Sequence, residues 1–253
     1  MDSLKIVSLD LFETLVHFNS KAFNSRITLQ NVMESQNDLP EMPFDVFYNH
    51  YVKIVRAKMS DYETEKEFRN DEVILDIWDK FNVTSGSKLK EKAFSIMEEY
   101  FRSVIGLITP FPGVYDTLDF LKNLGLRLIL TSNHSWPQNG WEVLRINRLE
   151  TYFDKIIFSA DLRWKKPSPR IFQEVISGFL NVERNQVLHI GDDFRADVIG
   201  GLNSGFKTIW INNLSSSLEL KDLPSSLNFL GTISEINQLP SFLTTNLEDN
   251  FDI

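Results

Sequence analysis

Four polar segments of the sequence contain the residue types that phosphoryl or acyl transfer requires. They are Asp10-Leu11-Phe12-Glu13-Thr14-Leu15, Thr131-Ser132-Asn133, Lys166-Pro167-Ser168-Pro169-Arg170-Ile171-Phe172 and Gly191-Asp192-Asp193-Phe194-Arg195-Ala196-Asp197. Together they supply a carboxylate nucleophile, a hydroxyl with nearby backbone donors, a lysine and several carboxylates. The carboxylates alone would repel an anionic substrate, whereas Mg²⁺ takes hard oxygen ligands and accepts phosphate oxygens in the same shell. The set therefore predicts magnesium-assisted attack of an aspartate on phosphorus.

Each polar segment follows a short apolar run that has the length and composition of a buried strand. The runs are rich in Leu, Ile and Val and span 4–9, 126–130, 155–158 and 187–190, and a fifth spans 207–211. Helical spacing lies between them, as in the stripe Val114, Leu118 and Leu121, which ends at Gly125. This alternation predicts a three-layer α/β sandwich with a parallel, Rossmann-like sheet. In such a sheet the strand ends meet at one ligand-binding crevice.

Residues 16–108 interrupt this alternation with helical stripes and no convincing strand. The stripes lie within 44–55, 73–81 and 89–104, and they predict a helical bundle inserted after the first strand. Residues 109–113, Thr-Pro-Phe-Pro-Gly, have the composition of a hinge back into the sheet domain. We therefore expect an α/β core of residues 1–15 and 109–243, a helical cap of residues 16–108, and a frayed acidic tail from residue 244.

Composition excludes several classes of protein. The 253 residues include 26 Lys and Arg against 35 Asp and Glu, so the net charge is −9, which disfavours nucleic-acid binding. No apolar stretch is long enough to span a bilayer, and the first residues lack the features of a signal peptide. The chain has no cysteine, so disulfides, thiolate metal sites and a cysteine nucleophile are excluded. We expect a cytoplasmic protein with a small-molecule substrate and leave its oligomeric state open.

The order and spacing of the four segments resemble the haloacid dehalogenase-like (HAD) superfamily. Residues 10–15 stand where that family has Asp-x-Asp-Gly-Thr-Leu, and Ser132-Asn133 is similar to its second motif. The lysine-proline segment at 166–172 is similar to the third motif, and Gly191-Asp192 with Asp197 is similar to the fourth. Each motif by itself is weak, but four in order after predicted strands are specific. The helical insert matches the family's C1 cap in position and type.

The resemblance implies a role for each motif residue. Asp10 is the implied nucleophile and a magnesium ligand, and the backbone carbonyl of Phe12 and the carboxylate of Asp192 are the implied further ligands. Asp193 or Asp197 is the implied support for the metal site.

The remaining implied roles concern the substrate. Ser132 and Asn133 are expected to hold the transferring group, with Thr14 as a further substrate-binding candidate. Lys166 is expected to neutralise charge on the nucleophile and the phosphoryl oxygens.

Phe12 is the main departure from the family pattern. In the family's phosphatases this position holds a second aspartate, which protonates the leaving oxygen, and the adjacent Glu13 is expected to point elsewhere. The family's dehalogenases also lack that aspartate, but they need no metal and have fewer carboxylates in the fourth motif. The leading hypothesis is thus a magnesium-dependent phosphatase for a small metabolite, acting through an aspartyl-phosphate. The alternatives are a metal-independent 2-haloacid dehalogenase that uses Asp10 and an inactive HAD-like binding protein.

Several neighbouring residues have competing interpretations. We favour Ser132 over Thr131 in the second motif and Lys166 over Lys165 in the third, and Asp193 is either a support of the metal site or a helix cap. We expect His189 to be a hydrogen-bonded core residue.

Some polar and aromatic residues outside the motifs have two interpretations, a role in the site or a purely structural role. His134 and Trp136 either line the crevice or pack in a loop. Arg26 and Arg56 are expected on a solvated face rather than at a substrate.

Overall fold

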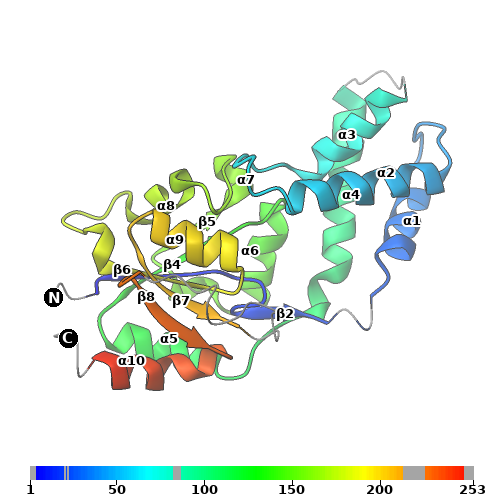
Figure 1. Cartoon of the computed structure of the whole chain (residues 1–253). Coiled ribbons are helices and arrows are strands. Elements are labelled where there is room, and N and C mark those ends of the chain that lie inside the picture. Colours follow the sequence, from blue (N-terminus) through cyan, green and yellow to red (C-terminus); the bar gives the residue numbers. More distant parts are fainter. Residues whose placement is uncertain (1–3, 20, 22, 82–86, 213–225, 248–253) are drawn as a thin grey trace.

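The computed structural model describes residues 4–19, 21, 23–81, 87–212 and 226–247. It contains a six-stranded parallel sheet in the order β5-β4-β1-β6-β7-β8 (Figure 1). The strands are β1 (Ile6–Leu9), β4 (Arg127–Ser132), β5 (Lys155–Phe158), β6 (Val187–Gly191), β7 (Lys207–Ile211) and β8 (Phe229–Ile233). The α/β class and the parallel sheet predicted from the sequence are confirmed, and the five predicted strands all form.

Helices cover both faces of the sheet because the strands are apolar on both sides. On one face Val7 and Leu9 of β1 pack with α5 (Val114–Asn123), α6 (Pro137–Ile146) and α10 (Leu239–Leu247). On the other face Ile6 packs with α8 (Pro169–Ile176). The short helix α7 (Ser159–Leu162) follows β5. The short helix α9 (Gly200–Asn203) follows a π-helical turn over Phe194–Ile199. These two apolar layers fix the strand ends that hold the polar segments.

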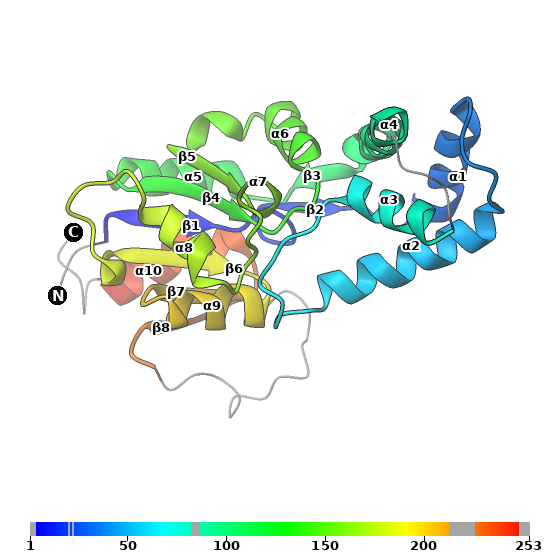
Figure 2. The same cartoon turned by 90° about the horizontal axis from the view of Figure 1, so that it is seen from above.

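The inserted helices stand to one side of the sheet (Figures 1 and 2). They are α1 (Ser25–Ser35), α2 (Phe44–Met59), α3 (Asn70–Lys80) and α4 (Ser87–Val104), and their apolar stripes form a separate core that includes Phe47, Ile74 and Met97. The chain enters and leaves this bundle through an antiparallel pair, β2 (Val16–Phe18) and β3 (Ile108–Pro110).

Two sequence expectations were wrong in detail, and two elements were not predicted. The insert was expected to hold no strand, but β2 forms because Val16–Phe18 pairs with Ile108–Pro110, a contact between distant segments. Strand β8 and helix α1 were not predicted. The tail was expected to fray from residue 244, but α10 continues to Leu247 because Leu239 and Leu243 are buried in the core, and residues 248–253 lie outside the described residues. Among the described residues, no helix has the length and apolar character needed to cross a membrane.

Candidate active site

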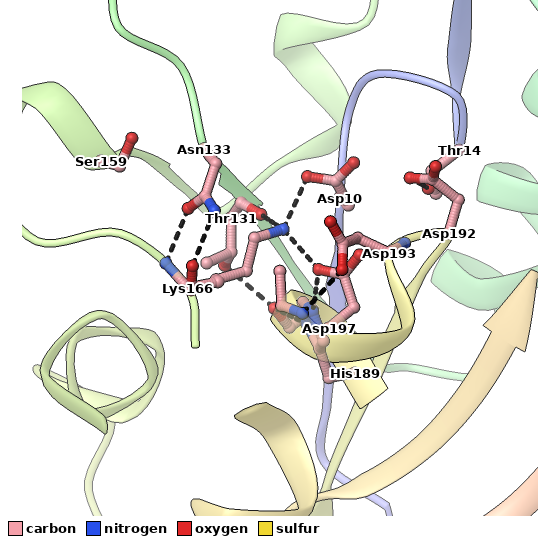
Figure 3. A network of polar contacts seen from close by, with 12 residues as sticks. Asp10, Thr14, Thr131, Asn133, Ser159, Lys166, His189, Asp192, Asp193 and Asp197 are labelled. Atoms are coloured by element: carbon pink, nitrogen blue, oxygen red, sulfur yellow. Dashed lines mark hydrogen bonds and ion pairs between the residues drawn. The ribbon is translucent and has the colours of Figure 1, made fainter. Parts of the chain in front are cut away.

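The four polar segments meet at the carboxyl edge of the sheet, as the alternation of strands and helices predicts. Asp10 directly follows β1, Ser132 ends β4 and Asp192 directly follows β6. Lys166 lies on the loop between α7 and α8. Figure 3 shows the side chains of Asp10, Lys166 and Asp197 directed toward one another.

Lys166 is the centre of the site. Its side chain is 1% exposed, and Nζ lies 2.6 Å from Asp10 Oδ1 and 2.6 Å from Asp197 Oδ1 (Figure 3). Nζ also donates to the carbonyl oxygen of Thr131 at 2.8 Å. Burial by itself would lower the pKa of Lys166, but the charges of Asp10 and Asp197 outweigh it and raise the pKa. Lys166 is therefore a permanent cation beside the nucleophile candidate, whereas Lys165 Nζ donates to the Lys58 carbonyl at 2.6 Å.

Asp10, Asp192 and Asp197 form a cluster of carboxylates. One oxygen from each lies within 4.8 Å of the others. Burial raises the pKa of Asp10 to about 6, although the positive charge of Lys166 opposes the rise. Burial and the negative charge of Asp10 together raise the pKa of Asp192 to about 8. A set of buried oxygen ligands with more negative than positive charge fits Mg²⁺. Of the predicted ligands, the structure thus brings together the carboxylates of Asp10 and Asp192, with Asp197 beside them.

Asp197 is held from three sides. Besides Lys166, it accepts a hydrogen bond from the backbone N–H of Asp193 at 3.0 Å, and its Oδ1 lies 3.0 Å from His189 Nε2. Burial opposes ionisation, but Lys166 and His189 lower the pKa of Asp197 below its usual range. A Cβ on Gly191 would lie 2.2 Å from the Asp197 carboxylate, so glycine is required there for close packing. His189 Nδ1 lies 2.9 Å from Ser8 Oγ, which confirms the prediction of a hydrogen-bonded core histidine.

Two predicted residues have other contacts in the structure. The side chain of Asp193 caps the turn Phe194–Ile199 by accepting from the N–H groups of Arg195 and Ala196, which is the helix-cap interpretation. The amide of Asn133 binds the backbone of Lys166 in both directions, at 2.7 and 2.9 Å. Asn133 therefore positions the lysine loop.

Of the remaining motif residues, only Thr14 has a described contact with a carboxylate of the cluster. Thr14 Oγ1 donates to Asp192 Oδ1 at 3.5 Å, and Ser132 is 1% exposed. Thr131 Oγ1 instead contacts Ser8 Oγ at 2.9 Å, away from the carboxylates. The predicted metal role of the Phe12 carbonyl stays a prediction.

Phe12 and Glu13 supply no acid beside Lys166. The Phe12 ring packs 5.0 Å from the His134 ring, and burial lowers the pKa of His134 to about 4, so this histidine is neutral near pH 7. Glu13 has φ 58° and lines a different cavity with Phe111 and Pro112. The expectation that its side chain points elsewhere stays a prediction.

A cavity of about 200 Å³ lies between the insert and the core and contains Lys166. Its other lining residues are Met59, Tyr62, Glu67, Phe68, Asn133, His134, Ser135, Lys165 and Asp193. His134 thus lines this cavity, whereas Trp136 is fully buried against the helices of the insert. Arg26 pairs with Asp45, and Arg56 is exposed, so both lie on the solvated face predicted for them.

The segment 58–72 of the insert contacts the lysine loop directly. Lys165 N–H donates to the Glu65 carbonyl at 2.9 Å, and Glu67 N–H donates to the Arg163 carbonyl at 3.1 Å. Two side-chain hydrogen bonds add to these contacts. Ser168 Oγ of the lysine loop donates to Glu65 at 2.7 Å, and Tyr62 OH donates to Asp193, which follows β6, at 2.5 Å.

Sequence reasoning missed Tyr62 and Glu67 as cavity residues. They lie between α2 and α3, outside both apolar stripes of the insert. The only sequence signal for these two residues is a polar interval between two amphipathic helices. This interval does not indicate which core residues they contact.

Known proteins agree with this architecture. The family model described as haloacid dehalogenase-like hydrolase matches residues 47–211. A glyceraldehyde 3-phosphate phosphatase from Methanothermobacter thermautotrophicus is 27% identical over 244 residues, covering 95% of this chain and 100% of that protein. A pyrimidine 5′-nucleotidase from Escherichia coli is 28% identical over 170 residues, covering 65% of this chain and 67% of that one.

Solved structures show the same fold. A 2-haloacid dehalogenase from Pseudomonas syringae superimposes with a TM-score of 0.70 at 20% identity, covering 96% of this chain and 99% of that one. A HAD phosphatase from Thermococcus onnurineus gives 0.66 at 19% identity, covering 95% and 98%. The chain belongs to the haloacid dehalogenase-like hydrolases. The two relatives named above are a glyceraldehyde 3-phosphate phosphatase and a pyrimidine 5′-nucleotidase.

Proposed function

We propose that this protein is a magnesium-dependent phosphatase that acts on a small phosphorylated metabolite through an aspartyl-phosphate at Asp10. The observation that supports it most is the convergence of Asp10, Asp192 and Asp197 beside the buried ammonium of Lys166. A dehalogenase has no need for so many carboxylates, whereas a phosphatase needs them to hold a cation. The phosphatase activities named for the relatives support the same choice.

The chemistry that we propose is a double displacement at phosphorus. Asp10 Oδ attacks, an oxygen–phosphorus bond forms, and the bond from phosphorus to the leaving oxygen breaks. Water then cleaves the acyl phosphate, which regenerates the carboxylate and releases phosphate. Lys166 stabilises the negative charge on Asp10 and the phosphoryl oxygens, and Asn133 keeps the lysine loop in place. When bound by Asp10 and Asp192, Mg²⁺ supplies further neutralisation of phosphoryl charge.

We further propose that residues 16–108 act as a cap over this site. The docking of the segment 58–72 on the lysine loop supports it, as does the position of Tyr62 and Glu67 in the wall of the cavity. A closed cap excludes water and macromolecular substrates during transfer.

The direct test is phosphate release from acetyl phosphate in the presence of Mg²⁺. We expect activity that chelation abolishes and that Asp10→Asn reduces by at least roughly 10³-fold. Lys166→Met should also be inactive, whereas Lys165→Met changes a lysine outside the ion-pair cluster and should retain turnover. Absence of phosphate release together with Mg²⁺ binding would favour a ligand-binding protein without activity.

Phe12 favours a second candidate, a 2-haloacid dehalogenase. Asp10 would then displace halide from carbon, forming an ester that water hydrolyses, and no leaving oxygen would need a proton. The test is halide release from 2-chloropropionate in the presence of a chelator. Release that survives chelation and vanishes in Asp10→Asn would replace the phosphatase proposal.

A further inference from the structure

The cavity beside Lys166 is lined by a buried acid, Glu67, which the proposed chemistry does not use. Glu67 is 8% exposed and comes from the insert, between α2 and α3. It lines the same cavity as Lys166 and Asn133, so a molecule held at Lys166 shares that space with it. A buried carboxylate is costly unless donors satisfy its oxygens.

Among the residues that the structure describes, donors satisfy only part of the Glu67 carboxylate. Oε2 accepts from Ser159 Oγ, and Oε1 accepts from the N–H of Phe68 at 2.9 Å. A carboxylate has about four acceptor positions, so two donors leave acceptor capacity on a residue that lines the cavity. Burial also raises the pKa of Glu67, which indicates incomplete compensation of its charge. A donor group on a ligand would complete this set.

The surrounding charges select the kind of donor. Lys165 and Lys58 both act on the Glu67 carboxylate and favour its ionised form. Lys165 also lines the cavity. A cationic donor such as an ammonium would be repelled by these lysines, whereas a neutral hydroxyl gains the hydrogen bond without that cost. The chemistry therefore favours an alcohol over an amine.

The cavity suits a small ligand. Its volume of about 200 Å³ accommodates a phosphoryl group with a short carbon chain.

We propose that Glu67 is a specificity-determining residue that binds a hydroxyl group on the leaving group of a short-chain acyl phosphate. This inference rests on the proposed phosphatase function and adds the substrate class to it. The leaving group is a small hydroxy acid, which departs as a stable carboxylate and needs no proton donor at Phe12, with its phosphate at Lys166 and its distal hydroxyl at Glu67. The cap thus contributes recognition to the site in addition to closing it.

The test measures binding, so that it does not depend on turnover of alkyl esters. Glycerol 3-phosphate, n-propyl phosphate and 3-aminopropyl phosphate are used as competitive inhibitors of acetyl phosphate hydrolysis with Mg²⁺ present. The wild type should bind glycerol 3-phosphate about tenfold more tightly than n-propyl phosphate, because a hydrogen bond to a charged group is lost in the second. Glu67→Met should bring the two inhibition constants within about twofold of each other.

Ser159→Ala is the matched control. It removes the Ser159–Glu67 hydrogen bond but leaves the carboxylate, and Ser159 is not among the cavity-lining residues. The preference for glycerol 3-phosphate should survive in this variant. Glu67→Gln gives a second measurement if the Met variant does not fold, and it should reduce the preference at least threefold because a charge-assisted hydrogen bond is about twice as strong as a neutral one.

Three results would overturn the inference. They are equal inhibition constants in the wild type, tighter binding of 3-aminopropyl phosphate than of glycerol 3-phosphate, and loss of the preference in Ser159→Ala. If acetyl phosphate is not hydrolysed, the proposed function has failed. Calorimetry with the same three esters then tests Glu67 separately, and the absence of any binding would overturn this inference too.

Discussion

The ring of Phe12 packs against the ring of His134, with their centroids 5.0 Å apart and their planes inclined by 37°. Phe12 is two residues after the nucleophile candidate, where the family's phosphatases have the aspartate that protonates the leaving oxygen. The neighbouring imidazole is neutral near pH 7, since burial lowers its pKa to about 4. The site therefore has a nucleophile and a cation but no proton donor at this position.

This arrangement makes turnover depend on the acidity of the leaving group. Acetyl phosphate and p-nitrophenyl phosphate release stable anions, whereas sugar phosphates release alkoxides that need a proton. We expect slow turnover of the first two and very weak turnover of sugar phosphates. Phe12→Asp should raise kcat/KM for sugar phosphates by up to roughly 10²-fold, the lower bound for general acid catalysis, and change acetyl phosphate much less.

Phe12→Leu is the control for this prediction, because it removes the ring from His134 without adding an acid. It should leave the ratio of the two substrate types unchanged. Equal kcat/KM values for acetyl phosphate and a sugar phosphate in the wild type would show that another group donates the proton.

Magnesium should stabilise the folded protein through Asp10 and Asp192. A ligand that binds only the folded state raises the melting temperature, and relief of carboxylate repulsion adds to the effect. We expect a rise of several degrees at millimolar Mg²⁺, most of which Asp192→Asn abolishes. The matched control is Asp193→Asn, since the Asp193 side chain caps a helical turn and asparagine also caps well. A melting temperature that does not respond to Mg²⁺, together with no heat of binding in calorimetry, would contradict the metal site.

Stability of the magnesium-free protein should fall as pH rises from 6.5 to 8. The pKa of Asp10 is raised to about 6 and that of Asp192 to about 8, so the folded state binds more protons than the unfolded state in this range. The free energy of unfolding then decreases with pH. His134 and His189 have lowered pKa values and act in the opposite direction, and because their unfolded pKa is about 6.5 this opposing effect fades as pH rises above about 7.

Thermal melts in a chelating buffer measure this slope. We expect a drop of at least about 3 °C across the range. Asp192→Asn should flatten it, and saturating Mg²⁺ should remove it because a bound cation favours ionised carboxylates. A melting temperature that rises with pH in the chelating buffer would show that these aspartates are not destabilised by burial.

The sequence was sufficient to predict most strands of the sheet, because these strands are continuous apolar runs buried on both faces. It was insufficient for β8, which is an edge strand with partly exposed residues and Gly231 in its centre. Strand β2 also escaped prediction, since it exists only through pairing with β3, about 90 residues away. Register between distant segments leaves no periodic signal in either one.

The candidate site follows the same logic. Asp10 and Asp192 were predicted because each directly follows a strand, Lys166 because it comes shortly after one, and parallel strands bring their ends together. The contacts of Asn133 with the Lys166 backbone and of Tyr62 with Asp193 were not predictable, because they join loops whose relative position depends on packing of the insert. Spacing thus located the reacting groups, and the tertiary structure was needed to identify the residues that position them.

The last prediction concerns the hydrogen bond from Tyr62 OH to Asp193 Oδ2, which joins the insert to the core at the cavity. Asp193 keeps two backbone donors when this bond is lost, so the helical turn that contains Asp197 should stay intact. Tyr62→Phe should therefore favour an open insert and raise KM for acetyl phosphate by about three- to tenfold with little change in kcat. Tyr48→Phe is the control, because Tyr48 OH contacts Ser25 Oγ at 2.8 Å within the insert. Equal KM values in the wild type and Tyr62→Phe, with Mg²⁺ binding unchanged, would show that this contact does not hold the insert closed.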